Sequence, residues 1–204
     1  MAEDANDSAV SENTSKTTDK TAAAINYPGL IAGILMIIIP FAGKWWTLQF
    51  GEDALYMSVS PFSLSVFSFG KEIVSPLFSS LTLALTVITI LFGIFMIGGS
   101  VPALYGGKRA ISDGLINSGS LKMLFVLVLF IITVIFAGFS FQQYFTGFGF
   151  SGSFPLISGQ SQMIMNAGDF SIEIPVTSSL LPAFFIGIIT AVLGIISRFY
   201  QKKH

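Results

Sequence analysis

The chain has 204 residues, of which 52% are hydrophobic and 10% are charged, and its formal net charge is -1. Soluble domains carry about 25% charged residues, so this composition predicts a membrane protein, and the weak net charge argues against nucleic-acid binding. Cysteine is absent and the single histidine is the last residue, His204. These two facts argue against thiol catalysis, against thiolate or imidazole metal sites and against a histidine general base.

The N-terminal segment differs in composition from the rest of the chain. Residues 1–26 are rich in Ser, Thr, Asp and Glu and show no apolar periodicity. Such a segment buries too little apolar surface to offset the entropy of folding. We therefore expect a disordered tail over this range.

Four long apolar stretches follow, each about as long as the 20 residues that an α-helix needs to cross a bilayer. Asn26 and Pro28 precede or open the first stretch, and Ser75 and Pro76 precede the second, as is typical of helix starts. Pro40 lies inside the first stretch and is expected to kink it. The predicted transmembrane helices are residues 27–48, 77–98, 121–142 and 179–200.

The basic residues predict the orientation. If the N-terminus is inside, only Lys44 and Lys71 of the 10 Lys and Arg residues lie outside, which is a strong positive-inside bias. Both termini are then cytoplasmic, and the protein is expected to be a multi-pass protein of the cell membrane. The cytoplasmic segments are 1–26, 99–120 and 201–204, and the outer loops are 49–76 and 143–178.

The first outer loop carries a β-strand pattern. Apolar residues alternate with serine over residues 57–60 and again over 62–66, and Pro61 separates the two runs. A period of two is the signature of strands with one buried face. Phe62 and Leu64 are expected to be buried.

The second outer loop contains two more β-like runs, which flank residues 166–169, a composition that suits a hairpin turn. Phe170 and Ile172 share one face of the second run and are expected to be buried. The sequence therefore predicts a membrane all-α bundle of four transmembrane helices with a small extracytoplasmic β-sheet formed by the two outer loops.

This layout resembles that of the claudin-type tetraspan proteins, which have four helices, both ends inside and β-strands in the outer loops. The Trp-Gly-Leu-Trp motif and the cysteine pair of that family are missing here, since Trp45-Trp46 is a different pattern and cysteine is absent. No residue role carries over, because a shared layout does not imply a shared function.

Small residues recur at a spacing of four on two of the predicted helices. Such residues let helix backbones approach closely. They are expected either to pack helices within the bundle or to form the seam of a homo-oligomer, and spacing alone does not separate the two. The positions are Gly29, Gly33, Ala183, Gly187 and Ala191.

Aromatic residues suggest two further features. Lys44, Trp45 and Trp46 lie near the end of the first predicted helix and are expected to anchor it at the lipid interface. Glycine alternates with phenylalanine in the second outer loop, which is interpreted as a loop packed on the sheet, a partner-binding tip or a lipid-inserting segment. The residues of this loop are Phe145, Phe148, Phe150 and Phe154.

The basic residues of the cytoplasmic segments lie where anionic lipid headgroups would be met. These basic residues are explained equally well if they only orient the protein in the membrane. The residues with an expected headgroup contact are Lys108, Arg109, Arg198, Lys202 and Lys203.

No motif in the sequence points to catalysis, to a cofactor or to a metal. Residues 106–109, Gly-Gly-Lys-Arg, lack the spacing of a phosphate-binding loop. The centres of the predicted helices carry no charged residue, which disfavours a proton relay or a charged filter. We expect a non-enzymatic protein that presents its β-domain for protein binding or complex assembly. The alternative is an oligomeric channel or carrier for a neutral or apolar solute.

Overall fold

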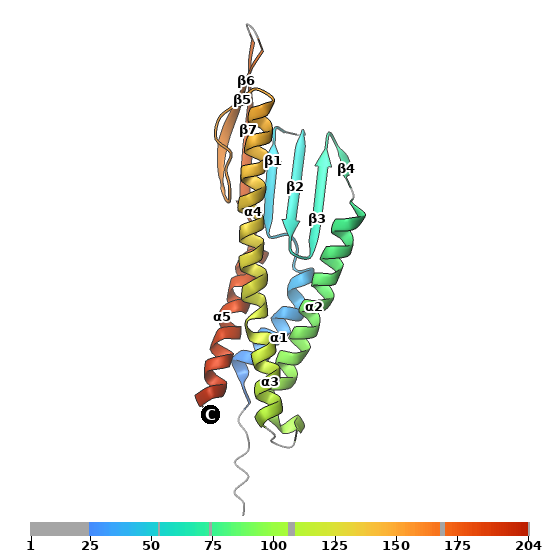
Figure 1. The fold of residues 1–204 in the computed structure, drawn as a ribbon, viewed down its shortest axis with the longest axis vertical. Helices are drawn as coiled ribbons and strands as arrows, with labels where there is room; N and C mark the ends of the chain where they lie inside the picture. The colour runs from blue at the N-terminus through green and yellow to red at the C-terminus, as the bar shows by residue number, and fades with distance from the viewer. Residues whose placement is uncertain (1–24, 53, 74, 106–108, 168–169, 204) are drawn as a thin grey trace, which may run out of the picture.

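The computed structural model describes residues 25–52, 54–73, 75–105, 109–167 and 170–203. The molecule is elongated, with a β-sheet at one end and a group of helices at the other (Figure 1). Among the described residues, three helical segments are long and apolar enough to cross a membrane by length and composition: Pro76–Ser100, Ala110–Gly147 and Pro182–Gln201.

The strands form one seven-stranded sheet in the order β4-β3-β2-β1-β7-β6-β5, and every neighbouring pair is antiparallel. The central pair, β1 and β7, joins strands that lie more than 100 residues apart, as in the register Phe50↔Val176. The strands are β1 (Trp46–Phe50), β2 (Leu55–Ser60), β3 (Ser63–Ser68), β4 (Lys71–Ile73), β5 (Phe150–Ser151), β6 (Gly159–Ala167) and β7 (Phe170–Leu180).

One helix begins and ends close to its predicted boundaries, and the other helices differ from theirs at one end or both. The expected second helix, 77–98, corresponds to α2. The helical elements are α1 (Tyr27–Ile38), η1 (Ile39–Phe41), α2 (Pro76–Ser100), η2 (Pro102–Tyr105), α3 (Arg109–Ser120), α4 (Lys122–Gly147) and α5 (Pro182–Lys203).

The first helix is shorter than expected. Asn26 caps it, since its Oδ1 accepts a hydrogen bond from the Gly29 N–H at 3.0 Å. The helix narrows to a 3-10 turn at Pro40, and the chain leaves it through Gly43, whose φ is +107°. Residues 46–48, expected at the end of this helix, belong instead to β1, because β2 and β7 hydrogen-bond to it on both sides.

The expected cytoplasmic loop 99–120 is largely helical. Helix α3 occupies most of it, and α4 begins at Lys122 immediately after α3 ends, so that Ala110–Gly147 is one apolar helical stretch. The expected fourth helix, 179–200, starts later, because Ser179 and Leu180 still belong to β7, where they pair with Thr47 and Trp46.

A buried aromatic cluster joins the sheet to the helices. The Trp45 ring meets Phe62, Phe130 and Phe184 edge-on at centroid distances of 5.8, 5.1 and 5.9 Å. Trp45 is 0% exposed and Trp46 is 1% exposed. Both indoles are therefore inside the molecule, contrary to the expectation that they anchor the chain at a lipid interface.

The far end of the β6–β7 hairpin extends beyond the rest of the sheet (Figure 1). Phe170 is 77% exposed and Ile172 is 52% exposed, so the expectation that both are buried is wrong. At Phe170 and Ile172, strand β7 pairs with β6 alone. From Val176 to Leu180, β7 also pairs with β1. Phe62, by contrast, is buried as expected.

Candidate functional site

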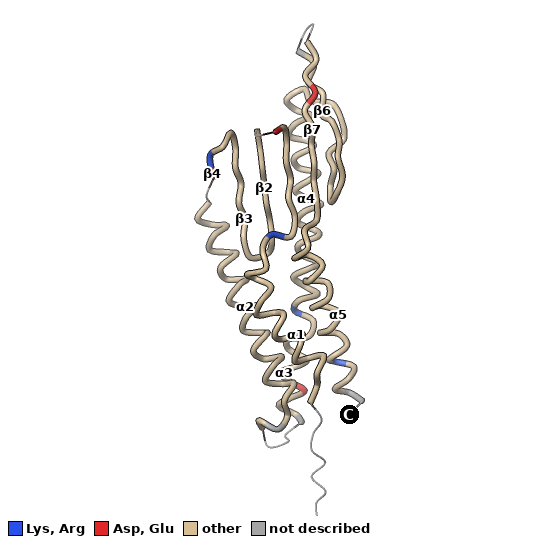
Figure 2. Tube along the Cα trace, turned by 180° about the vertical axis from the view of Figure 1, so that it is seen from behind, with Lys and Arg blue, Asp and Glu red and all other residues tan. Residues whose placement is uncertain are grey.

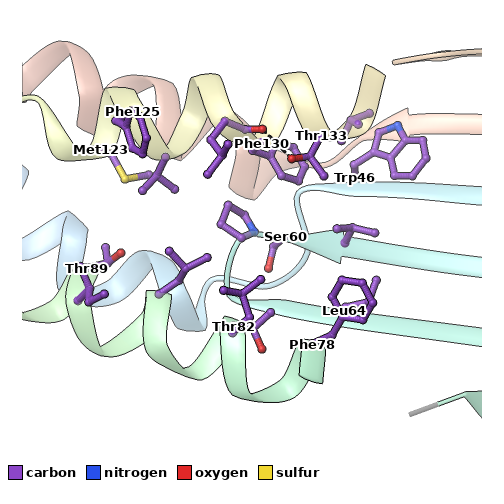
Figure 3. Close-up of a pocket in the computed structure, with 18 of the residues that line it drawn as sticks. Trp46, Ser60, Leu64, Phe78, Thr82, Thr89, Met123, Phe125, Phe130 and Thr133 are labelled. Carbon is purple, nitrogen blue, oxygen red and sulfur yellow. Dashed lines mark hydrogen bonds between the residues drawn. The ribbon is translucent and has the colours of Figure 1, made fainter. Parts of the chain in front are cut away.

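An open groove lies between α2 and α4. Its volume is about 530 Å³, and its floor is made by the β2–β3 hairpin, Trp46 and Met36 of α1. Figure 3 shows Thr82 and Thr89 of α2 on one side, Phe125, Phe130 and Thr133 of α4 on the other, and the hairpin between them.

The groove exists because its two walls pack on different partners. Helix α2 packs mainly on α1 and α3, whereas α4 packs on α5 and makes few contacts with α2. At the sheet end, Phe145 of α4 stacks on Phe50 of β1 with ring centroids 4.4 Å apart. The β2–β3 hairpin lies between α2 and α4, and Phe62 at its turn packs on Trp45.

The groove is almost entirely apolar. Among its hydroxyl groups, Thr82 Oγ1 donates to Ser79 O at 3.1 Å and Thr133 Oγ1 donates to Leu129 O at 2.8 Å. Hydroxyls that donate to their own helix have no hydrogen left to donate to a ligand. Ser60 is likewise engaged, since its Oγ accepts from the Ser63 N–H at 3.0 Å. The groove is therefore better suited to an apolar ligand than to a polar solute.

Lys122 is the one charged residue among those that line the groove. Its Nζ lies 5.2 Å from the centre of the Phe92 ring, a cation–π arrangement that links α4 to α2. No other interaction of its ammonium is recorded among the described residues. Lys122 marks one end of the groove, and Phe141, on the sheet side, marks the other; along α4 they are about 28 Å apart at a rise of 1.5 Å per residue.

The small residues expected at helix contacts are all buried, and none of them lines the groove. A Cβ added to Gly187 would lie 3.0 Å from Trp45, and one added to Gly29 would collide with Ser100 and Ser197. These contacts are internal to the molecule. The positions are Gly29, Gly33, Ala183, Gly187 and Ala191.

Lys44 lies at the junction of α1 and β1. Its Nζ donates to Ser65 Oγ of β3 at 2.9 Å. Burial lowers the pKa of the Lys44 ammonium, and the nearby negative charge of Glu72 acts in the opposite direction. Of the three residues expected as an anchor, it alone is only partly buried.

The phenylalanines of the second loop mostly pack α4 onto the sheet. Phe145 contacts Phe50, and Phe154 is buried with its ring stacked on Phe141 at 6.0 Å. Phe148 is exposed. Among the four phenylalanines that were considered for partner binding, only Phe148 has a largely exposed side chain. The four are Phe145, Phe148, Phe150 and Phe154.

The cluster expected to contact headgroups is described only at Arg198. That residue lines a depression of about 400 Å³ between α3 and α5, next to Asp113 and Gln201. The Gln201 amide donates to Asp113 Oδ1 at 2.9 Å. The other side chains of the cluster lie outside the described part of the chain: Lys108, Arg109, Lys202 and Lys203.

Neither the groove nor the position of Lys122 within it was expected from the sequence. Lys122 was one of the basic residues that predict the cytoplasmic side. No pattern in the sequence marks the groove, because it depends on how α2 and α4 pack on different partners.

The comparisons with known proteins are negative: the chain matches no protein-family model and no curated protein.

Proposed function

We propose that the protein crosses a cell membrane four times, with both termini in the cytoplasm and the sheet outside. The three long helices would cross together with α1 and η1, which pack against α2 and α5. Large apolar side chains point outward from these helices, such as Phe136, which is 73% exposed. Figure 2 supports the same arrangement, because charged residues are sparse along the helices.

Within this arrangement, we propose that the groove between α2 and α4 holds one hydrocarbon chain taken from the bilayer. The observation that carries this proposal is an apolar groove of about 530 Å³ between two helices that are long and apolar enough to cross a membrane. Ligand pockets typically have volumes of about 300–1,000 Å³. A polar solute would find few free hydrogen-bonding groups there, whereas a hydrocarbon chain needs none.

The shape of the groove favours a binding or carrier role over a pore. Its lining runs from Lys122 and Phe92 up to Met57 and Trp46 on the sheet, so one chain would reach from the bilayer onto the β-domain. The bound molecule is then an apolar solute, as in the alternative function expected from the sequence. A single copy of the protein binds it, without an oligomer.

A photoactivatable long-chain alcohol, added to the protein in detergent, tests this proposal. We expect its cross-links to concentrate on groove residues such as Met57 and Phe92. Thr133→Trp, which fills the groove, should reduce the cross-linking several-fold. Ile132→Trp is the matched control, because Ile132 is exposed on α4 and does not line the groove. Equal labelling around the whole of α4, unaffected by Thr133→Trp, would contradict the proposal.

A second candidate function is protein binding through the β-domain. The observation that favours it is the projecting β6–β7 hairpin, where Phe170 and Ile172 are largely exposed. Exposed aromatic and aliphatic residues are frequent anchors of protein interfaces. A partner that co-purifies with the native protein and is lost in Ile172→Asp would support this candidate; retention of the partner would reject the hairpin as its binding site.

A further inference from the structure

We propose that the groove takes an anionic single-chain amphiphile, a long-chain carboxylate, whose acid group pairs with Lys122 and whose tail extends toward the sheet. This inference rests on the proposed function, since it names the ligand class of the same groove.

Lys122 is an exposed residue at the start of α4, and α3 ends two residues before it, at Ser120. It contacts Phe92, which is about 12 Å along α2 from Ser100 and about 24 Å from Pro76 at 1.5 Å per residue. If α2 crosses the bilayer, the ammonium sits on the cytoplasmic side of the midpoint but within the apolar layer. An ionisable residue at such a depth is costly and marks a functional site by default.

The surroundings of Lys122 leave its charge without an anionic partner among the described residues. Its recorded contact is the face of Phe92, and Met123, Phe125 and Val126 line the groove next to it. A charge among apolar side chains is stabilised far more by an opposite charge than by a ring face. A carboxylate supplies that charge together with hydrogen-bond acceptors for the ammonium.

The rest of the groove selects the remainder of the ligand. From Lys122 the apolar lining continues for about 28 Å along α4 to Phe141, which suits one extended chain. The hydroxyls of Thr82 and Thr133 donate to their own helix backbones, so they have no hydrogen left to donate to a second polar group on the ligand. A phospholipid fits less well, because it has two chains and a bulky headgroup that belongs at the membrane surface.

Binding of three probes to the purified full-length protein tests the inference. The probes are a long-chain carboxylate, the alcohol of the same chain length and an anionic phospholipid, each measured by displacement of a fluorescent long-chain alcohol. We expect the carboxylate to bind about tenfold more tightly than the alcohol, because hydrogen bonds to charged groups are the stronger ones. Tighter binding of the phospholipid than of the carboxylate would overturn the ligand class.

Two variants assign the effect to one side chain. Lys122→Met should lower carboxylate affinity to about that of the alcohol, and retained binding of the alcohol shows that the variant is folded. Lys71→Met, at an exposed position on β4, should change neither affinity. Unchanged carboxylate affinity in Lys122→Met, with both probes still bound, would overturn this inference alone. Failure of the native protein to bind any of the chains would overturn the proposed function as well.

Discussion

Gly33 of α1 and Gly93 of α2 face each other where the two helices cross. A Cβ built on Gly33 would lie 2.8 Å from the Gly93 carbonyl oxygen and 2.7 Å from Ile97 Cγ1. Real Cβ atoms do not approach a backbone this closely, so the close contact of the two helices depends on the missing side chains. This contact holds α2 against α1 and thereby away from α4.

Gly33→Ala should destabilise the protein. The added methyl group must push α1 and α2 apart, and overpacking of this kind typically costs about 1–3 kcal/mol. The measurement is the thermal unfolding midpoint in detergent, which should fall.

The matched control is Gly114→Ala in α3, where an added Cβ would meet nothing within 4 Å. Alanine favours a helix over glycine by up to about 1 kcal/mol, so this midpoint should stay level or rise. Equal destabilisation by both changes would show that the Gly33–Gly93 contact is not a tight one.

The β6–β7 hairpin is an element with two environments along its length. Met163 pairs with Ile174 in the lower part and is 0% exposed, whereas Ile172, two residues nearer the tip, is 52% exposed. The lower part is covered by the rest of the molecule, and the upper part extends past it (Figure 1). The hairpin thus combines a fixed base with an accessible end.

Aspartate substitutions should separate these two parts. Met163→Asp places an unpaired charge in the core, and an uncompensated buried charge is strongly destabilising, by about 3–5 kcal/mol. Ile172→Asp leaves its charge in contact with solvent, so a small change is expected. Limited proteolysis and melting curves in detergent measure both; similar damage from the two substitutions would mean that the far end of the hairpin is covered.

At the scale of the whole molecule, the sheet and the helices form one continuous body. Helix α1 leads into β1, and β7 leads into α5, and these two strands are hydrogen-bonded neighbours. The Leu181 N–H also donates to the Trp45 carbonyl at 2.8 Å, directly at the junction. The sheet therefore lies at one end of the long axis, while α1 begins and α5 ends at the other (Figure 1).

This arrangement gives a direct test of the orientation. The chain has no cysteine, so single cysteines can be introduced without background. Gln160→Cys and Glu173→Cys, at exposed positions on the sheet, should react with a membrane-impermeant thiol reagent in intact cells. Asn117→Cys, exposed on α3, should react only after permeabilisation. The opposite labelling pattern would reverse the proposed topology.

Local composition was sufficient to predict α2, α4 and the β2–β3 hairpin. A long apolar run requires a helix in lipid, because every backbone group must be hydrogen-bonded within the segment. The serine alternation around Pro61 likewise indicates strands on both sides of it, since the side-chain period of a strand is two; the strand ends differ, and Phe62 lies in the turn. These features depend only on neighbours in the chain, so the sequence by itself determined them.

Other features depended on segments far apart in the chain. Trp46 lies in an apolar run that suits a helix, yet pairing with Val59 and Leu180 makes it part of a strand. The exposure of Phe170 depends on how far β1 extends beside β7, and the position of Lys122 in a groove depends on how far α4 diverges from α2. Only the tertiary structure decided these features, because backbone pairing and helix divergence are set by contacts between distant residues, and local patterning does not encode them.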